Sequence, residues 1–184
     1  TYNVETPTFR LNNPTRAGYT FLGWTGTGHD VATDELEIAQ GSTGNKSFTA
    51  NWEANTDVVY HVKYFLESLD STDSDVEDNY IVQENVELSG TTGPSINAQI
   101  KSFSGFTHYA EHPNAKESGT IEGDGSEVLK VFYKRNSYDV TITKDENIDQ
   151  TTGAQTYKFG ETVNIAATTK TFEGYTVTFK EWET

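Results

Sequence analysis

An acidic stretch in the middle of the chain holds the densest set of side chains that could bind a metal ion. Alternating carboxylates in a loop suit Ca²⁺, which takes several oxygen ligands. If Asp73 opened an EF-hand loop, Glu84 would stand at its last ligand position, but Asp78 replaces the turn glycine and no helix is predicted on either side. We leave two interpretations open, a calcium site and the solvated tip of a hairpin, for Asp70, Asp73, Asp75, Glu77 and Asp78.

A second pattern has the spacing of a zinc site. His108, Glu111 and His112 match H-x-x-E-H, the inverted zinc-protease motif. That chemistry needs both histidines on one face of a helix, with the glutamate activating a metal-bound water. The string follows a predicted strand start, and Pro113 disfavours helical backbone at His112. The sequence therefore favours a strand and turn over a zinc site, and we expect no enzyme.

Aromatic residues are abundant, with ten Tyr, ten Phe and three Trp. Rings at regular framework positions are expected in the core, whereas exposed rings in β-domains stack on sugars. Tyr80 and Tyr109 lie outside the regular positions, so we predict them as exposed ligand-binding residues.

A self-formed isopeptide bond is a further chemistry open to a chain that contains no cysteine. It needs a core lysine, an Asn or Asp, and a nearby acidic side chain. The candidates lie in predicted strands, and the sequence assigns no pairing among them: Lys63, Lys130, Lys144 and Asn164.

The net charge of the chain argues against two classes of binding partner. Thirteen basic residues stand against 28 acidic ones, which gives a net charge of −15 and a pI near 4.5. Clustered Lys and Arg, which phosphate binding requires, are missing, so we expect neither nucleic acid nor an anionic membrane as partner. No segment has the apolar length of a membrane span, and we expect no membrane insertion.

A Gly-aromatic-Thr motif, called the phrase below, occurs three times and indicates how the chain is divided into modules. The three copies are Gly18-Tyr19-Thr20, Gly105-Phe106-Thr107 and Gly174-Tyr175-Thr176. Recurrence at this spacing predicts tandem small modules rather than one large core. A glycine before a large ring indicates a bend with positive φ, and the ring then begins a strand. We expect the rings of the phrase in the core, together with Trp24, and we expect Trp52 and Trp182 in the core or at module interfaces.

The elements that position these residues are predicted as short strands with alternating patterns. We expect strands at 47–52, 59–66, 126–133, 138–143, 162–166 and 175–179. One short helix is expected in each module, at 94–101 in the middle one and at 6–11 and 166–170 in the others. Polar linkers place the module boundaries at 1–56, 57–136 and 137–184.

The first module carries a family resemblance. Its phrase Pro14-Thr15-Arg16-Ala17-Gly18-Tyr19-Thr20-Phe21-Leu22-Gly23-Trp24 and its closing Phe48-Thr49-Ala50-Asn51-Trp52 resemble the Listeria–Bacteroides repeat, or internalin B-repeat, of bacterial surface proteins. The segment from Tyr138 resembles a divergent copy. The stretch from Tyr60 to Tyr133 is similar to mucin-binding-protein-type repeats of Gram-positive surface proteins.

The resemblance implies a mainly β (α+β) fold of tandem β-grasp-like modules in an elongated array. It also implies an extracellular location on a bacterial cell surface, in a wall-anchored parent protein. Two functions stay open: a spacer or stalk that projects an adhesive or enzymatic head, and an adhesin module that binds host glycoprotein, mucin or another surface protein. No catalytic residues come with the resemblance, and calcium is the one cofactor left open.

The chain departs from the family at both ends. The first module lacks the family's opening strand, and the third stops where two more strands would follow. We expect the chain to be an interior fragment whose neighbouring repeats are its direct partners.

Overall fold

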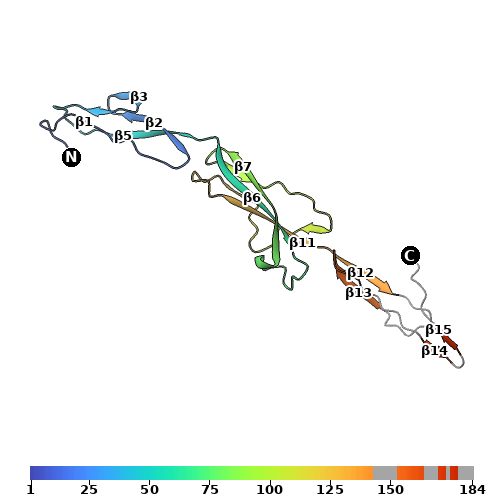
Figure 1. Ribbon diagram of the computed structural model, residues 1–184. Helices are drawn as coiled ribbons and strands as arrows, with labels where there is room; N and C mark the ends of the chain where they lie inside the picture. Colours follow the sequence, from blue (N-terminus) through green and yellow to red (C-terminus); the bar gives the residue numbers. More distant parts are fainter. Residues whose placement is uncertain (143–152, 164–169, 173–174, 178–184) are drawn as a thin grey trace. The chain divides into compact units, whose positions relative to one another are not determined.

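The computed structural model describes residues 1–142, 153–163, 170–172 and 175–177, and their regular structure is almost entirely β-strand (Figure 1). Within these residues the helical content is a single 3₁₀ turn, η1, at Glu77–Asn79. The mainly β prediction is therefore confirmed.

The chain divides into two compact units. The first unit holds residues 1–64, 84–99 and 115–131, and the second holds residues 65–83, 100–114 and 132–184. Strands β6, β7 and β11 contribute residues to both. The predicted module boundaries at 56 and 136 follow the chain rather than these units, and they stay a prediction.

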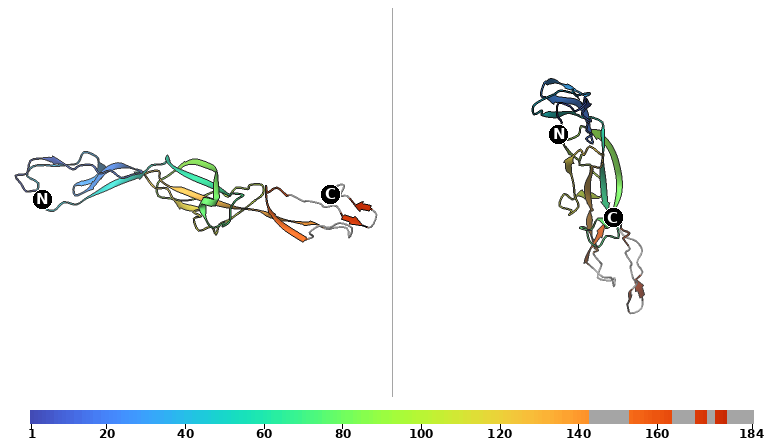
Figure 2. Two further views of the ribbon diagram at one scale, coloured as in Figure 1. Left: turned by 60° about the horizontal axis from the view of Figure 1, so that its bottom comes forward. Right: turned by 90° about the vertical axis from the view of Figure 1, so that its left-hand side faces the viewer.

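The first unit begins with a three-stranded antiparallel sheet of order β3-β2-β5. Strand β2 spans Tyr19–Gly26, β3 spans His29–Thr33 and β5 spans Phe48–Ala54. Figure 2 shows this part of the chain, coloured blue to cyan, from two further directions. A short ladder of β1 (Phe9–Arg10) and β4 (Glu37–Ile38) accompanies this sheet. Leu36 and Ile38 are the buried apolar side chains among residues 1–54, so this part of the unit has a small core.

The predicted helix at 94–101 is wrong. Strand β8 spans Ser95–Asn97 and pairs antiparallel with β10, Ser118–Thr120. Ile96 and Ile100 have the spacing of a helical face, but a strand more than twenty residues away in sequence supplies the backbone partners instead. The short helix expected at 6–11 is also wrong, because Phe9 and Arg10 form β1. The one expected at 166–170 lies outside the described residues except for Lys170, which opens β14.

The long strands form a four-stranded sheet of order β7-β6-β11-β9. Strand β6 spans Val58–Glu67, β7 spans Tyr80–Gly90, β9 spans Phe106–His108 and β11 spans Val128–Arg135. In the first unit its buried side chains include Val62, Tyr64, Leu129 and Val131, and in the second unit they include Phe65, Leu66, Phe132 and Tyr133. The strands predicted at 47–52, 59–66 and 126–133 are confirmed as β5, β6 and β11.

The second unit adds two antiparallel hairpins. Strand β12 (Ser137–Ile142) pairs with β13 (Gly153–Lys158), and β14 (Lys170–Phe172) pairs with β15 (Tyr175–Val177). The strands predicted at 138–143 and 175–179 are confirmed over their described residues. Thr162 and Val163 form no strand, and the rest of the strand expected at 162–166 lies outside the described residues.

Candidate functional site

The H-x-x-E-H string forms a strand and a turn, as favoured. His108 ends β9 and pairs with Tyr133 of β11. The His112 ring is 3% exposed and stacks on Phe132 with ring centroids 3.7 Å apart, and its Nδ1 accepts the Asn114 amide at 3.1 Å. Glu111 is exposed. The two histidines therefore do not share a helix face, and His112 is a packed core ring.

The carboxylates of the acidic loop are engaged separately. Asp73 Oδ1 accepts the amide N–H of Asp75 at 2.9 Å, and Glu77 Oε2 accepts the Asn114 side-chain amide at 2.9 Å. Asp70 and Asp78 are exposed. Across the described part of the chain, no three His, Asp or Glu side chains come together around one point that could hold a metal ion. Calcium binding at this loop stays a prediction.

The two predicted ligand-binding tyrosines have different surroundings. The exposed position expected for Tyr80 is wrong: its ring is 8% exposed, packs edge-on against His112 and Phe132, and donates its hydroxyl to the Ser74 carbonyl at 2.8 Å. Tyr80 begins a long strand, and its ring faces the core of the second unit. Tyr109 is half-buried, donates its hydroxyl to Asp75 Oδ1 at 2.5 Å and lies under the Lys134 ammonium, 3.5 Å from the ring centroid.

Both phenols are expected to ionise late in an alkaline titration. Burial raises the pKa of Tyr80, with the negative charge of Glu67 adding to it, and the hydrogen bond to Asp75 raises the pKa of Tyr109. A raised folded-state pKa favours the neutral phenol, so this stabilisation is present below pH 10 and is lost as pH rises through the raised pKa. Ultraviolet titration should show a component above pH 10 that shrinks in Tyr109→Phe. An unchanged late component in that variant would contradict the hydrogen bond's role.

The arrangement that recurs in this structure is a joint built on a linker asparagine. In the first unit the Asn55 amide donates to the Gly18 carbonyl at 2.9 Å, and the Thr20 hydroxyl donates to Asn55 Oδ1 at 2.8 Å. The Asn55 carbonyl then accepts the amide N–H of Thr92 at 3.0 Å. We call Gly18, Thr20, Asn55 and Thr92 the first joint. It ties the repeated phrase, the linker after β5 and the turn after β7 to one residue.

At the first joint the backbone around Gly18 lies very close to the backbone at Gly123. Gly18 has φ +74°, and a Cβ there would lie 2.4 Å from Gly123 Cα and 2.5 Å from Thr92 Oγ1. A Cβ at Gly123 would lie 2.0 Å from the Ala17 carbonyl oxygen. Arg16 caps the site with its guanidinium 3.7 Å from the Tyr19 ring centroid. Glycine is therefore required on both sides of the contact.

The second unit contains the same set of hydrogen bonds. The Asn136 amide donates to the Gly105 carbonyl at 2.9 Å, the Thr107 hydroxyl donates to Asn136 Oδ1 at 2.7 Å, and the Asn136 carbonyl accepts the Phe159 amide at 2.7 Å. We call Gly105, Thr107, Asn136 and Phe159 the second joint. Gly105 has φ +80°, and a Cβ there would lie 2.1 Å from the Phe159 ring.

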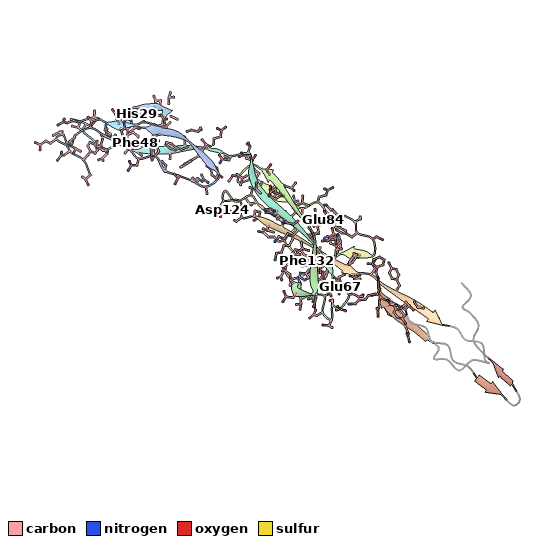
Figure 3. All side chains as sticks on the ribbon, in the orientation of Figure 1. His29, Phe48, Glu67, Glu84, Asp124 and Phe132 are labelled. Atoms are coloured by element: carbon pink, nitrogen blue, oxygen red, sulfur yellow. The ribbon has the colours of Figure 1, made fainter. Side chains whose placement is uncertain are left out.

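Charged groups reinforce the second joint. Arg135 lies with its guanidinium carbon 4.7 Å from the Phe106 ring centroid and donates to the Phe159 carbonyl at 2.7 Å. It also donates to the Glu67 carbonyl, while the Glu67 carboxylate accepts the Arg135 amide at 2.9 Å. Figure 3 labels Glu67 on the ribbon. Lys158 places its ammonium 3.5 Å from Glu67 and 2.7 Å from the Ser71 carbonyl. Glu67 is 5% exposed, so its charge is held by fixed partners rather than by water.

Sequence reasoning found the phrase but missed the asparagines. Positive φ at the first glycine of the phrase is confirmed for Gly18 and Gly105. The phrase rings Tyr19 and Phe106 are half-buried at the joints rather than in the core. The available signal was the position of one asparagine in each linker, 53–57 and 134–137.

The tryptophans of the first unit form a partly buried cluster. Phe21 packs edge-on against Trp24 at 5.6 Å and against Trp52 at 5.3 Å between ring centroids. Both indoles are half-buried, so the core position expected for Trp24 holds only in part. Trp182 lies outside the described residues, as do Lys144 and Asn164. Lys63 and Lys130 lie in β6 and β11, and no isopeptide pairing is assigned to them.

Two threonines of the first joint should respond in opposite directions to the same substitution. Thr92 Oγ1 is buried and has no hydrogen-bond partner among the described residues, so Thr92→Val should raise the free energy of unfolding by about 0.5–1 kcal/mol. Thr20→Val removes a donor to Asn55 and should lower it by about 1 kcal/mol. Urea denaturation measures both. A loss in Thr92→Val as large as that in Thr20→Val would contradict the assigned geometry.

No family model, curated protein or solved structure matched this chain in the comparisons made with them. Among the described residues, no helix is both long and apolar enough to cross a membrane.

Proposed function

We propose that the chain is a non-catalytic spacer whose repeat modules are held in fixed succession by the asparagine joints. One observation carries the proposal: the same three hydrogen bonds on a linker asparagine are built twice, once in each unit. A linker meant to be flexible leaves its backbone groups to water. Here the amide and the side chain of the linker residue are bonded to the repeated phrase, and its carbonyl is bonded to another segment.

Coupling of this kind suits a repeat array. The stability of such an array is the sum of its modules and their nearest-neighbour contacts. The part of the chain from β1 to β5 has a small core, so a joint that binds its end to the next segment adds to its stability. The net charge of −15 keeps an array soluble and separate from its copies through self-repulsion.

The resemblance to Listeria–Bacteroides and mucin-binding-protein-type repeats supports a setting for this spacer. Under the proposal the chain belongs to a bacterial cell-surface protein, as tandem β-grasp-like modules that carry an adhesive or enzymatic head away from the wall. Its direct partners are then the neighbouring repeats. The motifs that carry this argument are the phrase ending in Trp24 and the closing strand ending in Trp52.

Spin-label distances test whether the first joint is rigid. The chain has no cysteine, so Val31→Cys and Leu88→Cys introduce its sole thiols, at positions 78% and 42% exposed in the first unit. We expect one narrow distance distribution between the two labels, and a broad one when Gly18→Ala is added. A broad distribution without Gly18→Ala would contradict the spacer proposal, because the linker would then be flexible.

One observation favours the second candidate, an adhesin module. Ile81 and Val82 are 54% and 50% exposed at the start of β7, which is an outer strand of its four-stranded sheet. Apolar side chains exposed on an outer strand mark surfaces that contact proteins. The partner would be a host glycoprotein, mucin or another surface protein.

Binding to immobilised mucin and a glycan array, with calcium and with chelator, tests the adhesin candidate. Saturable binding lost in Ile81→Lys and Val82→Lys would support it. Saturable binding lost with chelator would instead assign the activity to the Asp70 to Asp78 loop. Absence of binding by a folded sample in both conditions would leave the spacer as the function.

A further inference from the structure

The first unit contains a third turn of the kind that receives the linker asparagine. In both joints the amide donor is followed by a glycine with positive φ, Gly93 at +100° after Thr92 and Gly160 at +82° after Phe159. Thr43 is followed by Gly44 at +78°. The segments also share their sequence, because Gly41-Ser42-Thr43-Gly44 matches Gly90-Thr91-Thr92-Gly93.

This third turn lacks the partner that the other two have. Thr43 is exposed, and its amide makes no hydrogen bond to another described residue. A Cβ at Gly44 would have nothing within 4 Å, whereas one at Gly93 would lie 3.2 Å from the Tyr19 hydroxyl and one at Gly160 would lie 3.3 Å from Arg135 Nη1. A cavity of about 650 Å³ lies beside the turn, lined by residues 1–4 and 42–46.

The turn at Thr43 and Gly44 is contacted by a tyrosine hydroxyl. Tyr2 donates its hydroxyl to the Gly44 carbonyl at 2.5 Å. In the first joint the hydroxyl of Tyr19, the ring of the repeated phrase, lies against the equivalent glycine. Tyr2 thus contacts the turn with the same chemical group that a phrase ring presents.

We infer that the turn Thr43–Gly44 is a docking site for the Gly-aromatic-Thr end of another repeat of this type, joined ahead of Asn3. The linker asparagine of this joint is Asn3, whose carbonyl accepts the Thr6 amide at 3.1 Å and would accept the Thr43 amide with its second lone pair, while the incoming ring replaces Tyr2 at Gly44. This inference rests on the proposed spacer function, because it extends the joint of that function to a further partner. The occupant is identified by the joint's chemistry: a phrase glycine, a ring and a threonine, followed by a linker asparagine.

A tandem protein provides the test. The 184-residue chain is followed directly by a second copy that begins at Asn3. Trp182-Glu183-Thr184 then precedes Asn3 as Trp52-Glu53-Ala54 precedes Asn55. The control is a single chain that begins at Asn3 and so lacks Tyr2 without gaining an occupant. Segmental isotope labelling of the second copy restricts the amide signals to the copy under test.

Amide hydrogen exchange of Thr43, Thr92 and Phe159 distinguishes the outcomes. We expect the Thr43 amide to exchange at least about tenfold more slowly in the tandem protein than in the control. Equal Thr43 rates, with Thr92 and Phe159 protected in both proteins, would overturn this inference and leave the spacer proposal standing. Rapid exchange of Thr92 and Phe159 in both proteins would overturn the spacer proposal and this inference with it.

Discussion

Replacing Gly18 by alanine is expected to open the first joint and to lower the free energy of unfolding by about 2–5 kcal/mol. Two penalties add at this position. The backbone has φ +74°, where an L side chain is strained, and the new methyl group would lie 2.4 Å from Gly123 Cα and 2.5 Å from Thr92 Oγ1. Both neighbours are held in place, Gly123 against Ala17 and Thr92 by its bond to Asn55. Urea denaturation followed by tryptophan fluorescence measures the loss, because Trp24 and Trp52 lie in the same unit.

Gly28 supplies the matched control for Gly18. Its φ is +79°, nearly that of Gly18, but a Cβ there would have no atom within 4 Å. Gly28→Ala therefore carries the backbone penalty alone, about 1–2 kcal/mol. The difference between the two variants measures the close approach at the joint. Equal losses of unfolding free energy would mean that Gly123 and Thr92 move aside freely for the new methyl group, and they would contradict a rigid first joint.

The sequence predicts the parts of the fold whose residue pattern is contained in a few consecutive residues. Alternation across residues 59–66 predicts β6, and a glycine before a large ring predicts the bend at Gly18 and at Gly105. The joints could not be predicted this way, because Asn55 and Asn136 each stand alone in a polar linker. Their role depends on Thr92 and Phe159, whose positions follow from strand pairing over long sequence distances.

Two further differences, at Phe65 and Tyr80, come from contacts that no local pattern predicts, and the first is burial on both faces of β6. Period-two alternation in β6 places Tyr64 and Leu66 on one face and predicts that Phe65 points to solvent. Phe65 is instead buried and stacks on Phe132 with centroids 4.6 Å apart. Tyr80 was expected outside for a different reason, because it lies away from the regular ring positions, and that position says nothing about the rings that meet it. Side chains packed around Phe132 in the second unit account for both residues.

Phe132→Ala is expected to lower the free energy of unfolding by about 3–5 kcal/mol, the range found when large buried aromatic side chains are truncated. The ring is fully buried and stacks on the rings of Phe65 and His112, with Tyr80 edge-on at 5.1 Å. Truncation leaves a cavity that three neighbouring rings line. Thermal and urea denaturation of the full chain measure the loss. Phe48→Ala, at a half-buried ring of the first unit, is the control and should cost about 1–2 kcal/mol.

Denaturation with and without zinc ions distinguishes two roles for the H-x-x-E-H string, core packing and metal binding. If His112 serves as a core ring, its contribution is tied to Phe132, and removing Phe132 should destabilise the chain whether or not zinc ions are added. Zinc should then leave the melting temperature of the unsubstituted chain unchanged, since the His112 ring is only 3% exposed and its Nδ1 is already an acceptor for the Asn114 amide. A zinc-dependent rise in melting temperature that His108→Ala abolishes would contradict the core assignment. It would instead require the string to leave the strand and turn geometry and bind metal.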